Sequence, residues 1–342
     1  MRVDLSDGRD FQSGTERFST ANNLDQTIIE ITDDLTMNMG QDHTVVLGTH
    51  LEFFKFDNLF IRENFGSYRF DSLDDLERGW AQQFDYSFSN TSNPQQSAEF
   101  NAADLAFYAG DTWNVNDTLV LTYGLRIDIP TFPDSPSFNA EAGAVFGIDT
   151  SAMPTGNILW SPRAGFNWDP NADGVQQVRG GIGIFTGRTP YVWLSNQYSN
   201  TGIEFSRISS RLSRPVNGTN FIQFVPDPDN QPTDIGFAST NEVDVTDPDF
   251  KFPTTTRITL GYDRQLPWQN MTFTTELIYS QIVQDAVWQN LNVVDTGDDF
   301  FDGRPLFGRN DSAFRDVINM TNTQEGRQWN LLLKAQKRYS NN

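Results

Sequence analysis

The stretch that decides the fold runs from Thr118 to Ile129 and reads TLVLTYGLRIDI. Its odd positions carry large apolar residues, and its even positions are small, polar or charged, with Val120 as the one large apolar exception. Successive side chains of a β-strand point to opposite faces. The alternation therefore predicts a strand with one face in an apolar medium and the other face in water.

The same period of two recurs along the chain. It is clear again in residues 158–169 and 257–266, where polar or charged residues alternate with aromatic and aliphatic ones, and it is weaker elsewhere. This pattern predicts nine strands in all. They lie at residues 29–39, 45–56, 105–115, 118–129, 158–169, 178–186, 258–266, 271–283 and 329–339.

The connections between the predicted strands alternate between short and long. Short polar turns lie at 40–42, 114–117, 170–174 and 267–270, and the long connections lie at about 57–102, 130–156, 189–253 and 290–328. Outer-membrane β-barrels have tight periplasmic turns and long extracellular loops, so the alternation favours this class. Aromatic residues also gather beside the short turns, as an interfacial girdle requires; they are Trp113, Trp168, Trp268 and Tyr339.

Composition excludes several other classes of protein. The chain has 24 Lys and Arg against 45 Asp and Glu, a formal net charge of -21, which repels phosphate backbones, so no nucleic acid partner is expected. It has no cysteine, which excludes disulfides and thiolate metal sites. No segment approaches the roughly 18 consecutive apolar residues of a membrane-spanning helix.

Four sequence blocks carry a resemblance to a known family. The first is FYAGDTW at 107–113 with LVLTYGLRID at 119–128, and the second is SPRAGF at 161–166 with VRGGIGIF at 178–185. The third is DPDFK at 247–251 with LGYDRQLP at 260–267, and the fourth is GRQWN at 326–330 with KRYSN at 337–341. In this order they resemble the barrel domain of TonB-dependent receptors, specifically the Oar-like branch with a carboxypeptidase-regulatory-like N-terminal domain.

The resemblance implies an all-β, antiparallel transmembrane β-barrel in the outer membrane of a Gram-negative bacterium. It implies TonB-coupled substrate uptake, with outer-membrane lipid, the TonB complex and an unknown extracellular nutrient as partners. Such a receptor also has a signal, a plug domain and closing C-terminal strands, and none of these is recognisable in residues 1–342. We therefore expect residues 1–342 to form a partial barrel domain, an open curled sheet of about nine strands, with the TonB complex contacting the missing N-terminal region.

No catalytic, cofactor or metal site is expected. Residues 169–174 match the first half of a calcium loop, but Gly180 stands where the bidentate glutamate would be needed, so a hairpin turn is predicted instead. His43 and His50 lie on one predicted strand at an odd separation, so they point to opposite faces and share no metal.

Aromatic residues of the long connection at 189–253 are candidates for substrate binding. Tyr191, Trp193 and Tyr198 would suit stacking on a ligand, and the alternative is that they pack the loop on itself. Two other functions stay open. One is a surface adhesin or passive pore on the same barrel, and the other is a soluble secreted β-protein such as a propeller or lectin.

Overall fold

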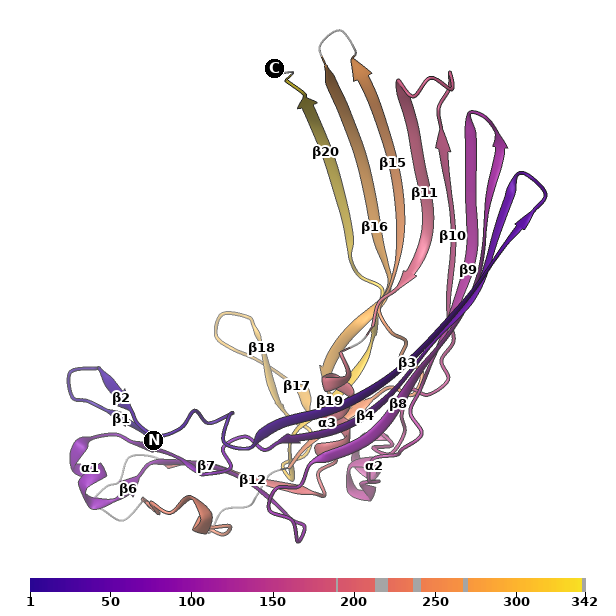
Figure 1. Ribbon diagram of the computed structural model, residues 1–342. Helices are drawn as coiled ribbons and strands as arrows, with labels where there is room; N and C mark the ends of the chain where they lie inside the picture. The colour runs from indigo at the N-terminus through magenta and orange to yellow at the C-terminus, as the bar shows by residue number, and fades with distance from the viewer. Residues whose placement is uncertain (189, 213–220, 236–240, 267–269, 340–342) are drawn as a thin grey trace.

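One curled, open antiparallel sheet dominates the structure, a computed structural model that describes residues 1–188, 190–212, 221–235, 241–266 and 270–339 (Figure 1). All nine predicted strands form, and neighbours in sequence lie side by side. They are β3 (Asn22–Met39), β4 (His43–Phe60), β8 (Ala98–Asn116), β9 (Leu119–Thr131), β10 (Leu159–Trp168), β11 (Gln176–Thr186), β15 (Thr254–Leu266), β16 (Met271–Asn290) and β20 (Arg327–Lys337). Within the described residues no pairing joins β3 to β20, so the sheet is open, as expected.

Local chemistry sets the short turns at one end of this sheet. Gly40, with φ of 71°, closes the turn between β3 and β4. Between β10 and β11 the Asp169 side chain accepts a hydrogen bond from the backbone N–H of Gly174 at 2.7 Å, and Gly174 has φ of 68°. The segment that resembles a calcium loop is therefore a hairpin turn, as predicted.

The two faces of the sheet separate apolar from polar side chains. The register pairs Gly124 of β9 with Arg163 of β10 and Leu125 with Pro162, so the charged residues of both strands share one face. Helix α3 (Tyr191–Ser199) packs against this face and lies on the inside of the curled sheet (Figure 1). The face with the charged residues is therefore the concave one. The convex face carries large apolar side chains that are exposed; they include Leu47, Trp160, Ile182 and Leu260.

Pro162 fits inside a strand because of where the ladders begin. Strand β10 pairs with β9 along its whole length, whereas its pairing with β11 begins only at Arg163. Pro162 therefore lies where β10 has a partner on one side only, and its missing N–H breaks no bond to β11.

The aromatic residues at the short turns lie largely where a girdle requires them. Trp113 lies near the end of β8 and Trp168 ends β10. Tyr339 follows β20 and is 75% exposed. Trp268 falls outside the described residues.

The long connections are not structureless, which the sequence reasoning missed. Together with residues 1–21, which precede β3, they carry a second sheet, in which β12 (Phe205–Arg211), β7 (Gln83–Ser89), β5 (Ser67–Phe70), β1 (Arg2–Asp4) and β2 (Asp10–Gln12) are neighbours. We call the long connections and residues 1–21 together the loop layer. Its other elements are α1 (Leu73–Arg78), β6 (Trp80–Ala81), α2 (Ala140–Phe146), α3, β13 (Ile222–Gln223), η1 (Pro228–Asn230), β14 (Asn241–Thr246), β17 (Val293–Asp299), β18 (Pro305–Arg309) and β19 (Phe314–Thr323).

Two strands of the loop layer join the large sheet and bring it to 11 strands. Strand β19 escaped prediction because its fully buried residues Phe314, Val317 and Met320 recur at every third position, not every second. Strand β14 pairs with β19 in parallel. Its acidic residues hid the alternation of Val243 and Val245.

The assignment of the faces predicts opposite responses at two adjacent residues. Leu47 points from β4 to the convex face and Val46 to the concave face. We expect Leu47→Arg to lower the free energy of unfolding by about 2–4 kcal/mol, because a guanidinium would face hydrocarbon. Val46→Arg should cost much less, and a folding titration of the full-length protein in lipid vesicles measures both. Equal costs would mean that the faces are assigned wrongly.

Candidate functional site

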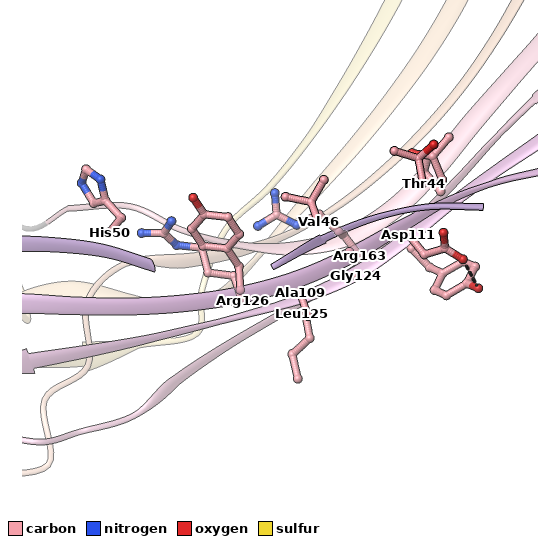
Figure 2. A pocket seen from close by; sticks show the side chains of 14 residues that line it. Thr44, Val46, His50, Ala109, Asp111, Gly124, Leu125, Arg126 and Arg163 are labelled. Atoms are coloured by element: carbon pink, nitrogen blue, oxygen red, sulfur yellow. Dashed lines mark hydrogen bonds between the residues drawn. The ribbon is translucent and has the colours of Figure 1, made fainter. Parts of the chain in front are cut away.

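A hollow lies on the large sheet, where β4, β8, β9 and β10 meet (Figure 2). Its volume is about 510 Å³. Figure 2 shows His50 and Arg126 on one side of the sheet, while Ala109 and Leu125 point to the other. His50, Tyr108, Arg126 and Arg163 of the lining therefore belong to the concave face, which is the interior face of a closed barrel, whereas Asp111 and Tyr123 belong to the convex face.

A row of charged side chains continues the hollow toward the loop layer. A second hollow of about 350 Å³ shares His50, Arg126 and Arg163 with the first. Two ion pairs line it. Arg188, in the loop after β11, binds Glu52 of β4, and on β9 the Arg126 Nε atom lies 2.8 Å from Asp128 Oδ1. Asp104 Oδ1 is buried and has no hydrogen-bond partner among the described residues. The surface can thus offer both donors and acceptors to a polar ligand.

Two long side chains bridge strands across this face by passing over a glycine. Tyr108 of β8 lies over Gly48 of β4, and its hydroxyl donates to Asp34 Oδ1 of β3 at 2.5 Å. A Cβ atom at Gly48 would overlap the Tyr108 ring. The close approach of the ring therefore favours glycine at this position.

Arg179 repeats this arrangement further along the sheet. It reaches from β11 across Gly261 of β15, and its guanidinium lies 3.0 Å from Asp263 and 3.0 Å from Glu276 of β16. A Cβ atom at Gly261 would lie 2.8 Å from Arg179 Cζ. These contacts tie three neighbouring strands together on the concave face.

The three aromatic candidates all lie on α3, where their rings contact the protein. Tyr191 is 7% exposed, and its ring centroid lies 4.8 Å from that of Phe54. Trp193 meets Trp288 edge-on at 4.7 Å, and Tyr198 stacks on Phe100 at 4.3 Å. The structure thus packs all three rings against wall strands, whereas the alternative considered from the sequence was packing of the loop on itself. Their binding of a substrate stays a prediction.

The sequence contained a signal for α3 that period-two reasoning could not use. Tyr191, Leu194 and Tyr198 recur at spacings of three and four, which is helical, and they line the face that packs on the sheet. A cavity of about 400 Å³ lies beside this helix. The gathering of charges on the concave face was also missed, because it depends on the register between strands.

One acidic group of the loop layer titrates far from its usual range. Asp244 lies on β14, and its Oδ2 atom accepts a hydrogen bond from Asn200 Nδ2 at 2.7 Å. Burial raises its pKa from 3.8 to about 7, and the nearby Glu242 adds to the rise. The charged carboxylate is thus unfavourable in the folded loop layer.

Neither a metal centre nor a membrane helix is found in the described part of the chain. It contains no group of three or more His, Cys, Asp or Glu side chains placed to hold a metal ion. His43 and His50 lie on opposite faces of β4, as predicted. None of its helices is long and apolar enough to cross a membrane.

A family model identifies the kind of domain that this chain forms. The family model described as "Outer membrane beta barrel domain" matches residues 2–342. The search of curated proteins gives no match.

Solved structures with a similar arrangement include one transporter and two receptors. The outer membrane transporter YddB from Escherichia coli is 11% identical with a TM-score of 0.48, and 91% of this chain covers 30% of that one. The siderophore receptor PirA from Pseudomonas aeruginosa is 12% identical with a TM-score of 0.44, and 92% of this chain covers 40% of that one. PirA from Acinetobacter baumannii is 12% identical with a TM-score of 0.47, and 91% of this chain covers 34% of that one. The chain therefore spans about a third of the length of these proteins.

The bridge over Gly48 predicts a cost for adding a single methyl group. We expect Gly48→Ala to lower the free energy of unfolding by about 1–3 kcal/mol, because the Tyr108 ring must move and leave Asp34. Gly110→Ala is the matched control, since its Cβ would lie 3.5 Å from the nearest atom, an ordinary contact. In a Tyr108→Ala background the Gly48→Ala cost should fall, because only the contact of the new Cβ with Asp34 Oδ1 remains and Asp34 is then released from the bridge. An unchanged cost there would refute the bridge.

The raised pKa of Asp244 predicts a pH dependence of the loop layer. The folded state holds a proton that the unfolded state has lost between pH about 3.8 and about 7, so stability should fall as pH rises through this window. Asp244→Asn should remove this part of the slope, because it stays neutral and still accepts from Asn200. Asp249→Asn changes an exposed acid and should leave the pH dependence of stability as it is in the unchanged protein. Melting temperatures across the window, measured in detergent, decide between the outcomes.

Proposed function

The chain belongs to the outer membrane beta barrel domain family, and from this premise we propose that it forms wall and outer loops of a receptor for TonB-coupled substrate uptake. Its place is the outer membrane of a Gram-negative bacterium. In the proposed orientation the short turns face the periplasm and the loop layer faces the medium.

The observation that carries the proposal is the folded loop layer above a charged concave face. Helix α3 and its neighbours pack on the extracellular end of β4 and β8, through Phe54, Phe56 and Phe100. Directly below lie the ion pairs of Arg188 and Arg126. A substrate that enters from the medium would pass a structured entrance and then meet alternating charges, which suits selective binding better than free diffusion.

The proposal assigns this chain only a part of the uptake cycle. Energy coupling would need the TonB complex and a plug domain, and we place both outside residues 1–342. The chain's own contribution is substrate contact at the loop layer, where Tyr191, Trp193 and Tyr198 stay candidates, and along the concave face. We assign it no catalytic step.

The alternatives gain less support from these features. A soluble propeller or lectin does not fit a member of an outer-membrane family. An adhesin would not need an ion pair such as Arg188 with Glu52 beneath the entrance, and a passive pore on the same barrel is distinguished from uptake by the energy dependence tested below. We therefore keep uptake as the proposed function.

Uptake predicts a solute whose disappearance from the medium needs both the receptor and the energised inner membrane. We expect deletion of the full-length gene to leave at least one nutrient in spent medium, measured by mass spectrometry, and re-expression to restore its removal. A protonophore should mimic the deletion within minutes. A passive pore would keep working in the presence of the protonophore, and an adhesin would change no solute at all.

A further inference from the structure

A polar cluster lies on the convex, membrane-facing side of the sheet. The register pairs Val45, Asp111 and Tyr123 across β4, β8 and β9 and puts all three on this face. Asp111 Oδ2 accepts from the Tyr123 hydroxyl at 2.7 Å and lies 2.7 Å from His43 Nδ1. A carboxylate facing lipid is costly in the middle of a bilayer, so the position of the cluster along the strands matters.

The cluster lies at the level of the lipid headgroups. His43 is the first residue of β4, directly after the short turn, and its ring stacks on Trp113 at 5.4 Å with an angle of 13°. Trp168 ends β10 at the same end of the sheet. Tryptophan rings prefer the interface between hydrocarbon and water. Ion pairs and hydrogen bonds are tolerated there, and phosphate groups of lipids lie within reach.

The hydrogen bond to Asp111 leaves one histidine nitrogen free for a ligand. An imidazole that faces a carboxylate through Nδ1 carries a proton there, so Nε2 points away from Asp111. The His43 side chain is 37% exposed, and within the described residues its Nε2 makes no hydrogen bond. In the imidazolium form both ring nitrogens are donors, so with Nδ1 engaged by Asp111 it is Nε2–H that would donate to a phosphate oxygen.

The surrounding charges select which headgroup fits. Asp42 precedes His43, and Asp117 lies in the neighbouring turn between β8 and β9; both are exposed. The convex residues of β3, β4, β8 and β9 at this end include no Lys or Arg; they are Met37, Met39, His43, Val45, Asp111, Trp113, Leu119, Leu121 and Tyr123. A headgroup with a net negative charge would be repelled by Asp42 and Asp117 and would find a single cation to bind. A zwitterionic headgroup would also bring an ammonium to Asp42.

We propose that His43, Asp111 and Asp42 form a binding site for the phosphoethanolamine headgroup of a phospholipid. His43 binds the phosphate, Asp111 orients His43, and Asp42 receives the ammonium. The acyl chains then lie along the apolar residues above the cluster, such as Val45 and Leu121. This site goes beyond substrate uptake and depends only on the position of the sheet in the membrane.

The test measures which lipid the full-length protein retains after gentle extraction. The protein is purified from mixed vesicles that hold equal amounts of phosphatidylethanolamine, phosphatidylglycerol and phosphatidylcholine, and bound lipid is counted by native mass spectrometry. We expect selective retention of phosphatidylethanolamine and a loss of about tenfold in His43→Gln, as for one charge-assisted hydrogen bond. His50→Gln is the matched control, because it changes the other histidine of the same strand on the concave face.

Two further measurements keep the outcome clear. His43→Phe preserves a ring over Trp113 without the nitrogen, so it should lose the lipid while folding normally, as seen by a heat-modifiable band in cold gel electrophoresis. Retention of phosphatidylglycerol at the same level, or retention unaffected by His43→Phe, would overturn the site. A second protein copy bound at this face in place of lipid would overturn it too. None of these results would touch uptake, which the nutrient measurement tests separately.

Discussion

The constraint behind this structure is that the wall is one strand thick. Every backbone donor and acceptor inside hydrocarbon must be satisfied by the strand beside it, because no second layer exists to help. Each strand must also present one face to lipid and the other to the interior. These two demands explain the alternation in residues 118–129 and the long ladders, such as the 18 paired residues of β3 and β4.

This constraint also explains how much could be predicted. Each wall strand alternates between its two faces along its whole length, so period two located all nine. Pro162 also fits the wall, because it lies where β10 is paired with β9 but not with β11. The loop layer follows no such rule. Its strands are as short as two residues, and β19 buries every third residue, so composition alone could not reveal them. The helix α3 was hidden because its aromatics looked like free ligand-binding groups.

The candidate site depends on the register between neighbouring strands, and a single sequence specifies this register only weakly. Arg188, Glu52 and the pair Arg126–Asp128 come from three separate segments, which are the loop after β11, β4 and β9, and they meet only when the strands align. Their signs alternate across the face, which limits the desolvation cost of gathering charge under the loop layer. The sequence showed that the interior would be polar. It did not show that its charges would be paired directly beneath the entrance.

The side chains that cross over glycines couple pairs of positions in evolution. Tyr108 passes over Gly48 and Arg179 passes over Gly261, so a side chain gained at either glycine would push the covering side chain aside. A lineage that changes the glycine first loses the bridge, whereas one that first replaces Tyr108 or Arg179 has already lost it and leaves the glycine free to drift. In a set of related sequences, each glycine and its covering residue should then vary together or not at all.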